Sequence, residues 1–347
     1  MSNLEKIDIY VPEKIGNLIK KDAMLFEIFK KDCRSINRNK FLNMLLKGYY
    51  NLYAEESQEK YNAIIEELQK AGLDKAKQAE TAEFILNKVV LPSIPPRKDK
   101  NPCRISLKPI NDTENIINNI LEELNGKDYI SQYFCRMIMS YCEKSLNERE
   151  QIIFRDYYNL FQNVCANKQI ITFSTIWDTK TIHQVIPYKI MTGQDEMFNY
   201  LLCAEINREN GTQRAIAYRL NRITKINLSN HREPLKDDVL RYLELMIQYG
   251  PQYAINDDEE TCVKLSDYGE KSYNRIYYGR PMVDHIEHKQ DGHYYYFRGS
   301  KDQIFLYFRK FGYNDAEVIS PDSLRNRIIA FHSNALNTYK KDRSSNG

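Results

Sequence analysis

The feature that most constrains this chain is a short strand followed by two helices, a pattern that occurs twice. Residues 6–12 (KIDIYVP) alternate apolar Ile7, Ile9 and Val11 with polar side chains, which is typical of a half-buried strand. Residues 104–109 (RISLKP) show the same alternation. An isolated strand leaves unpaired backbone groups along both edges, so it needs a partner. We therefore expect these two strands to pair with each other.

Each predicted strand is followed by two helices with apolar residues at helical spacing. The first pair is expected over residues 13–31 and from an N-cap at Ser35, and the second pair over 116–124 and 130–141. Residues 54–102 between the two units begin as a charged helical stretch and end in a Pro-rich spacer, so they are interpreted as a linker.

Both units resemble the ribbon-helix-helix family of DNA-binding proteins, in which two such units pair their strands into an antiparallel ribbon. The resemblance implies that the ribbon lies in the DNA major groove and that its outward side chains contact base edges. The outward residues would be Lys6, Asp8, Tyr10, Arg104, Ser106 and Lys108. The same alternation is typical of any strand with one solvated face, so the pattern supports the fold more strongly than it supports DNA binding.

From residue 169 the sequence changes to short β-rich runs. These runs are separated by turn residues such as 177–179 and Asn210-Gly211, and they are QIITFSTI, IHQVIPYKIM, FNYLLCAEI and QRAIAYRLNRITKI. Several short strands at close, regular spacing predict a small antiparallel barrel.

This region resembles the WYL domain, a five-stranded barrel similar to SH3 and Sm proteins. Pro187 stands at the family's proline-led strand, 199–201 (Asn-Tyr-Leu) at its Trp-Tyr-Leu strand, and 218–223 (YRLNRI) at its Phe-Arg-Leu-Asp-Arg-Ile strand end. Asn199 replaces the family's tryptophan and Asn221 its aspartate.

WYL domains bind nucleic acid or nucleotide ligands, often single strands, on a basic and aromatic patch. By this resemblance Arg219 and Arg222 contact phosphate or stack on bases, and Tyr200 and Tyr188 stack on bases. His183 and Ser174 are the polar residues that line a pocket. The basic residues Lys180, Lys189 and Arg214 form the rim of that pocket. A tyrosine in a small barrel is more often packed in the core, and an arginine near a strand end commonly pairs with an acid, so Tyr200 and Arg222 also have a structural interpretation.

Residues 233–341 predict a small α+β domain of strand, helix, hairpin and helix. Its stretch 310–328 resembles the extension that often follows WYL domains, which implies dimer contacts. A metal site is not expected at the histidines of the hairpin. A His-x-x-His pair such as His285 and His288 does not converge on a strand, and no Cys or carboxylate set completes four ligands.

Composition narrows the functional classes. The net charge is +3, but 1–53 carry 10 basic and 6 acidic side chains and 151–235 carry 10 and 7, so two basic segments are diluted by the rest. The sequence has only 13 glycines and lacks a P-loop, a G-x-G-x-x-G motif and an H-E-x-x-H motif. This argues against an enzyme or a nucleotide cofactor. Seven cysteines without a C-x-x-C pair favour reduced thiols, and the lack of an 18-residue apolar run or a signal-peptide h-region predicts a soluble, cytoplasmic protein with no membrane partner.

The expected fold is therefore multidomain α+β. It comprises tandem ribbon-helix-helix units (1–150), a WYL barrel with a leading helix (151–232) and a C-terminal dimerisation domain (233–341). This order resembles the WYL accessory proteins of type VI-D CRISPR systems. The resemblance implies a homodimer that binds single-stranded RNA, or single-stranded DNA, and stimulates the CRISPR effector ribonuclease. The alternative is a ligand-sensing transcriptional regulator that binds duplex DNA through the ribbon.

Overall fold

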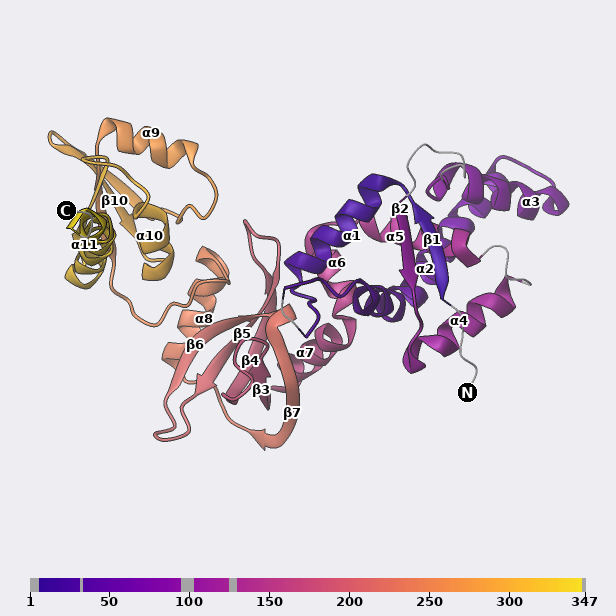
Figure 1. The fold of residues 1–347 in the computed structure, drawn as a ribbon, viewed down its shortest axis with the longest axis horizontal. Helices are drawn as coiled ribbons and strands as arrows, with labels where there is room; N and C mark the ends of the chain where they lie inside the picture. The colour runs from indigo at the N-terminus through magenta and orange to yellow at the C-terminus, as the bar shows by residue number, and fades with distance from the viewer. Residues whose placement is uncertain (1–5, 32–33, 95–102, 125–129, 345–347) are drawn as a thin grey trace. The chain divides into compact units, whose positions relative to one another are not determined.

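The computed structural model in Figure 1 describes residues 6–31, 34–94, 103–124 and 130–344. It contains helices and three antiparallel sheets, which confirms the α+β class. The chain divides into unit 1 (Met1–Asn159) and unit 2 (Leu160–Gly347). Among the described residues, no helix combines the length and apolar character needed to cross a membrane.

The two predicted strands of unit 1 pair with each other, as expected. Strand β1 (Ile7–Val11) runs antiparallel to β2 (Cys103–Leu107), with Ile9 opposite Ile105. Both of these isoleucines are buried, so the apolar half of each alternation faces the helices. The ribbon is thus held by burial of one face, which also sets its register.

The helices of unit 1 cover the buried face of this ribbon. Helix α5 packs against β1 and α2 against β2, so the second helix after each strand contacts the strand of the other repeat. The helical elements are α1 (Glu13–Leu25), α2 (Arg38–Lys70), α3 (Lys75–Ile85), a π-helical turn η1 (Leu86–Val90), α4 (Asn111–Glu123), α5 (Ile130–Cys142) and α6 (Leu146–Ile153).

Helix α2 differs from its prediction at both ends. Its N-cap is Asn37, whose side chain accepts a hydrogen bond from Lys40 N at 3.0 Å, and not Ser35. At the other end it continues through residue 54 to Lys70, because its charged second half consists of good helix formers. No break therefore separates the first repeat from the charged stretch. The Pro-rich part of the expected linker falls mostly on 95–102, outside the described residues.

A buried polar network joins α1, α5 and α6. The Asp22 carboxylate is fully buried and accepts hydrogen bonds from Arg149 Nε at 2.7 Å and from Tyr141 Oη at 2.9 Å. Burial, followed by the nearby Asp22 charge, raises the pKa of Tyr141 well above its usual value. These groups satisfy one another and fix how the three helices pack.

Unit 2 begins with a five-stranded antiparallel sheet in the order β6-β5-β4-β3-β7 (Figure 1). The strands are β3 (Gln169–Thr175), β4 (His183–Thr192), β5 (Asn199–Ile206), β6 (Gln213–Arg219) and β7 (Ile223–Arg232). The last predicted run is two strands, because a short 3-10 helix, η3 (Leu220–Arg222), divides it. Helix α7 (Arg155–Asn167) leads into the sheet, and α8 (Asp237–Tyr249) packs on β6 and β5.

This sheet is strongly curved. The ring of Tyr218 on β6 lies 4.9 Å, between centroids, from that of Phe173 on β3, although β5 and β4 separate these strands. Neighbouring strands are about 4.8 Å apart, so a flat sheet would hold β6 and β3 about three spacings apart. Closure into the predicted barrel is not confirmed, because the hydrogen-bonded order still leaves β6 and β7 as edges.

The rest of unit 2 is a four-stranded sheet covered by helices. The sheet has the order β11-β8-β10-β9, and its elements match the predicted strand, helix, hairpin and helix. They are β8 (Thr261–Leu265), α9 (Asp267–Arg275), β9 (His285–Lys289), β10 (Gly292–Phe297), α10 (Lys301–Phe308), β11 (Ala316–Ser320) and α11 (Asp322–Ser344). Its core is rich in aromatic rings, among them Tyr273, Tyr295, Phe297 and Tyr307. Many tyrosines of the chain therefore serve packing.

Candidate nucleic-acid interface

The outward face of the ribbon is partly self-neutralised. Asp8 lies opposite Ser106, accepts a hydrogen bond from its Oγ at 2.6 Å, and forms an ion pair with Arg104. The hydrogen bond from Arg104, helped by that from Ser106, lowers the pKa of Asp8 to about 2. The guanidinium that was expected to read bases is thus engaged with a carboxylate on the same face.

The other outward residues of the ribbon remain accessible. Tyr10 is half exposed, and Lys6 and Lys108 are exposed at the end where β1 begins and β2 ends. Asn39 of α2 holds the Lys108 backbone, because Asn39 Oδ1 accepts from Lys108 N at 2.7 Å and Asn39 Nδ2 donates to Lys108 O at 3.1 Å. The face combines three cations with one anion, enough for non-specific attraction to phosphate.

A polar network occupies the curved sheet of unit 2. Glu205 on β5 is its centre: its Oε1 lies 2.7 Å from His183 Nδ1 and accepts from Tyr218 Oη at 2.8 Å. Its Oε2 accepts two hydrogen bonds from Arg214, from Nε at 2.9 Å and from Nη2 at 2.6 Å. The ring of Phe173 packs against those of His183 and Tyr218.

The electrostatics of this network favour an ionised Glu205. Burial alone would raise the pKa of Glu205, but the hydrogen bonds from His183, Tyr218 and Arg214 outweigh burial and lower it. Burial, with the hydrogen bond to Glu205, raises the pKa of Tyr218 far above its usual value. The network is a satisfied, half-buried scaffold, and it holds the expected rim residue Arg214 against the sheet.

Two of these four residues were predicted from the sequence, and two were missed. His183 and Arg214 were expected in the site, whereas Glu205 and Tyr218 were not. One signal was available: Glu205 is an acid within the run LLCAEI of β5, whose other residues are apolar or small. An acid in an almost wholly buried strand requires partners, and these are found on the neighbouring strands.

Tyr200 and Arg219, a predicted stacking residue and a predicted phosphate ligand, lie opposite each other on β5 and β6. Tyr200 is only 7% exposed and its hydroxyl donates to Glu196 Oε2 at 2.6 Å, which matches the core interpretation rather than base stacking. The Arg219 guanidinium is half-buried and lies over the Phe198 ring, with Cζ 3.2 Å from the ring centroid.

The remaining predicted residues spread over the sheet and are not brought into one pocket. Ser174 is buried opposite Thr224, and Tyr188 is half-buried at a bulge in β4. Lys180 and Lys189 are exposed, and Arg222 in η3 is half-buried.

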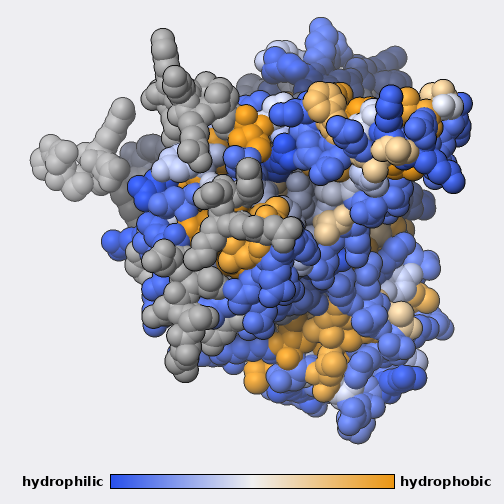
Figure 2. Space-filling model, turned by 90° about the vertical axis from the view of Figure 1, so that its right-hand side faces the viewer, coloured by the Kyte–Doolittle hydropathy of each residue, from blue (hydrophilic) through white to orange (hydrophobic). Residues whose placement is uncertain are grey.

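Exposed hydrophobic side chains mark further surfaces. Figure 2 shows a mostly hydrophilic face on which hydrophobic side chains gather in a few separate patches. Scattered apolar residues are normal on protein surfaces. An exposed aromatic ring beside an exposed cation is more informative, because single-stranded nucleic acid binds to that combination.

The turn between β3 and β4 has this combination. Trp177, the single tryptophan of the chain, is 64% exposed, and Lys180 is exposed three residues later. Asp178 orders the turn: its Oδ1 accepts from Lys180 N at 3.0 Å and from Thr181 N at 3.1 Å. Hydrogen bonds from Thr181, side chain and then backbone, lower the Asp178 pKa.

The same turn lies next to the second arginine of the sequence motif. Ile176 N donates to Arg222 O at 2.9 Å, which ties the turn to η3. We define Trp177, Lys180 and Arg222 as the turn surface. Lys180 and Arg222 were predicted as binding residues, whereas Trp177 was used only as a turn marker, since exposure of its ring depends on the turn around Asp178.

Comparison with known proteins gives a fold likeness. No family model matches the chain, and no curated protein matches it. Among solved structures, the chain is similar to one described as "Crystal structure of a CRISPR Cas-related protein", with 20% identity and a TM-score of 0.67, over 99% of this chain and 97% of that chain. Proteasome accessory factor B/C (PafBC) of Arthrobacter aurescens is 14% identical over 54% of this chain and 27% of that chain, and its TM-score of 0.25 is too low to support an argument. The first likeness shows a shared fold over nearly the whole length.

Proposed function

We propose that this chain is a CRISPR accessory protein that binds single-stranded RNA and stimulates an RNA-guided ribonuclease of type VI-D, without catalysing a reaction itself. The observation that carries the proposal is the whole-length fold likeness to a protein described as CRISPR Cas-related. A protein of this class requires a nucleic-acid surface and no catalytic centre, and the ordered turn surface of unit 2 is our candidate for it.

The domain assignments belong to the same proposal. The paired strands β1 and β2, each followed by two helices, support a ribbon-helix-helix architecture for unit 1. The curvature that brings Tyr218 against Phe173 supports a barrel of WYL type, with η3 between its last two strands.

We assign RNA contact to the turn surface. The exposed Trp177 ring offers a face on which an unstacked base can lie, and Lys180 offers a charge for the adjacent phosphate. Such stacking contributes about 1–3 kcal/mol per base and does not depend strongly on sequence. In a duplex the base faces are already stacked, so this surface favours single strands.

We propose in addition that helix α11 pairs with α11 of a second copy. Ile329, His332, Leu336 and Tyr339 are exposed and follow one another at spacings of three, four and three residues. This spacing places them on one face of the helix and is typical of a helix–helix seam. Replacing Ile329 and Leu336 by Asp, or truncating the chain after Pro234, should yield monomers by light scattering, and a persistent dimer would reject this interface.

The alternative function is a transcriptional regulator that binds duplex DNA through the ribbon. The accessible Lys6, Tyr10 and Lys108 on the outward face favour it, since a two-stranded ribbon fits the major groove. The Asp8–Arg104 pair weighs against it, because it neutralises a base-reading side chain.

A competition binding assay with single-stranded RNA, single-stranded DNA and duplex DNA over a salt series tests the proposal. We expect single-stranded RNA to compete best and the Trp177→Ala/Lys180→Ala variant to lose that binding, while Lys6→Ala/Lys108→Ala retains it. Preferential duplex binding with the reverse pattern among the variants would contradict the proposal and support the regulator.

A further inference from the structure

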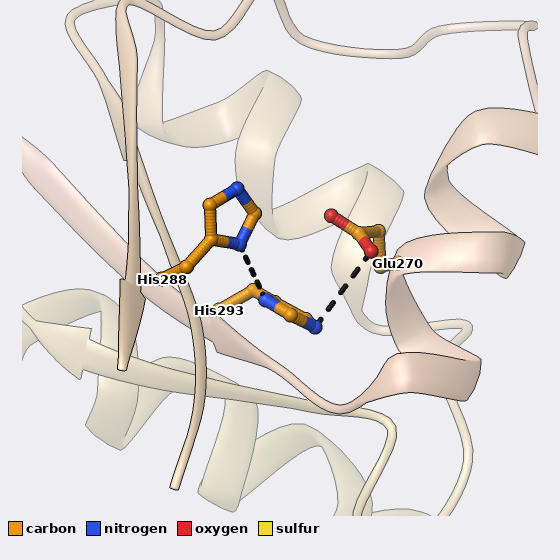
Figure 3. Close-up of side chains that lie close together, drawn as sticks. All are labelled: Glu270, His288 and His293. Carbon is orange, nitrogen blue, oxygen red and sulfur yellow. Dashed lines mark hydrogen bonds and ion pairs between the residues drawn. The ribbon is translucent and has the colours of Figure 1, made fainter. Parts of the chain in front are cut away.

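The hairpin of unit 2 brings two histidines and a glutamate together. His288 on β9 lies directly opposite His293 on β10, and their Nδ1 atoms are 2.6 Å apart. Glu270 on α9 approaches from the other side, with Oε2 3.7 Å from His293 Nε2. Figure 3 shows the three side chains converging from two strands and a helix.

The expectation for the hairpin concerned His285 and His288 on one strand, and it did not consider pairing across the two strands. Strand alternation does separate His285 from His288, and His285 stacks on Tyr296 at 4.1 Å between ring centroids. Residues that face each other across an antiparallel pair nevertheless lie on the same face. The partner of His288 is therefore His293, and this face also meets α9.

We propose that His288, His293 and Glu270 bind a divalent transition-metal ion of the zinc class. One ligand atom from each residue can be chosen so that all three lie within 4.8 Å of one another. Two imidazoles and a carboxylate are a ligand set that Zn²⁺ takes with a fourth position left open. Neutral imidazoles suit Zn²⁺ better than Mg²⁺ or Ca²⁺, which prefer oxygen.

Small movements convert the cluster to coordination geometry. Zinc–nitrogen bonds of about 2.0–2.1 Å place tetrahedral ligand atoms about 3.3 Å apart. The nitrogens of His288 and His293 must therefore separate slightly, and the His293 ring must turn so that one nitrogen faces the same point as Glu270. The separation is feasible because His288 lies on β9, an edge strand that is exposed throughout.

The surroundings already orient the carboxylate ligand. Tyr295 Oη donates to Glu270 Oε1 at 2.8 Å, which leaves Oε2 for the ion. Asp267 Oδ1 lies 3.0 Å from His293 Nε2 and offers a further oxygen. Such outer contacts typically change metal affinity about 10–100-fold.

Calorimetric titration of the full-length, chelator-treated and reduced chain with Zn²⁺ alone tests the proposal. The variants are His288→Asn, His293→Asn and Glu270→Gln, and the matched control is His285→Asn on the same strand. Because the chain contains seven cysteines, Co²⁺ is titrated as well, since its absorption spectrum distinguishes nitrogen and oxygen ligands from thiolate.

We expect one tight site, weakened more than about 100-fold by each ligand variant, since loss of an outer contact alone costs about 10–100-fold. The control should bind like the wild type, and the Co²⁺ spectrum should lack a thiolate charge-transfer band. Absence of a stoichiometric site, binding that survives the three substitutions, or a thiolate spectrum would overturn the proposal. His288 is exposed, so if the His293 variant loses its fold by circular dichroism, His288→Asn decides the question.

Discussion

The ribbon of unit 1 and the turn surface of unit 2 are both basic and aromatic, yet they differ in what their acidic residue contacts. On the ribbon, Asp8 binds Arg104 and Ser106, so much of the outward face satisfies itself. In the turn, the Asp178 carboxylate accepts hydrogen bonds from two backbone N–H groups and from the Thr181 hydroxyl, which orders the loop. The Trp177 ring and the Lys180 side chain are exposed. An acid beside a cation can therefore either cancel a binding surface or build one, depending on what it contacts.

The largest expected effect is on RNA binding by the turn. The Trp177→Ala/Lys180→Ala variant should weaken single-stranded RNA binding about 10–100-fold, because it removes a stacking face and a phosphate contact. Fluorescence anisotropy measures the affinity, and Phe84→Ala is the control, since Phe84 is equally exposed but lies in unit 1. Lys180→Ala alone should also reduce the salt slope by about 0.7. Unchanged affinity in the double variant would remove the turn from the interface.

The second-largest effect is expected on stability, from the Glu205 network in the curved sheet. Glu205→Gln should lower the free energy of unfolding by about 1–3 kcal/mol, because partly buried donors of His183, Tyr218 and Arg214 lose a charged acceptor. Urea denaturation measures the change, with the exposed Glu209→Gln as control. Equal stability of the two variants would show that the network contributes nothing.

The contribution of Glu205 to the free energy of unfolding should disappear at low pH. Its pKa in the folded chain is lowered, so as the pH falls the unfolded chain takes up the proton first. The stabilisation is complete above the unfolded value of about 4.3 and disappears as the pH falls through the lower folded value. The stability gap between wild type and Glu205→Gln should therefore stay constant near neutral pH and narrow below about 4.3. A gap that widens in acid would contradict this assignment.

A smaller effect, on duplex DNA affinity, is expected when Arg104 on the ribbon is released from Asp8. Asp8→Asn removes the anion that engages Arg104, so duplex DNA affinity should rise a few-fold and depend more steeply on salt. Glu13→Gln, an exposed acid at the start of α1, is the control for the change in net charge. An equal gain in both variants would mean that the Asp8–Arg104 contact itself is irrelevant.

The smallest effect is expected from the ribbon lysines. Lys6→Ala/Lys108→Ala should leave single-stranded RNA affinity within about twofold, because the proposed RNA contacts belong to the turn surface and not to the ribbon. A loss comparable to that of the turn variant would place RNA on the ribbon as well.

The sequence predicted the parts of this fold that depend on local periodicity. The alternation predicted the strands β1 and β2, and the unpaired backbone edges of each isolated strand predicted their pairing. Contacts set by register and curvature were not predictable in this way. Alternation identifies the face on which His288 or Glu205 lies, but not the residue on the next strand that meets it.

The candidate site shows the same division. Arg222 was predicted by its motif position, His183 as a polar pocket residue and Lys180 as part of a basic rim, while Trp177 was missed because its exposure results from the closed turn around Asp178. Tyr200 occupies the predicted strand, yet its ring is buried. A motif thus indicated the region, and packing decided which of its side chains reach solvent.

The most direct test of the central proposal is to map where RNA touches the chain. Single-stranded RNA that carries a photoreactive uridine is cross-linked to the full-length protein, and the modified peptides are identified by mass spectrometry. We expect cross-links at residues 176–183, and their loss in Trp177→Ala/Lys180→Ala. Cross-links confined to 6–10 and 103–108 would contradict the account, because they would place the nucleic acid on the ribbon.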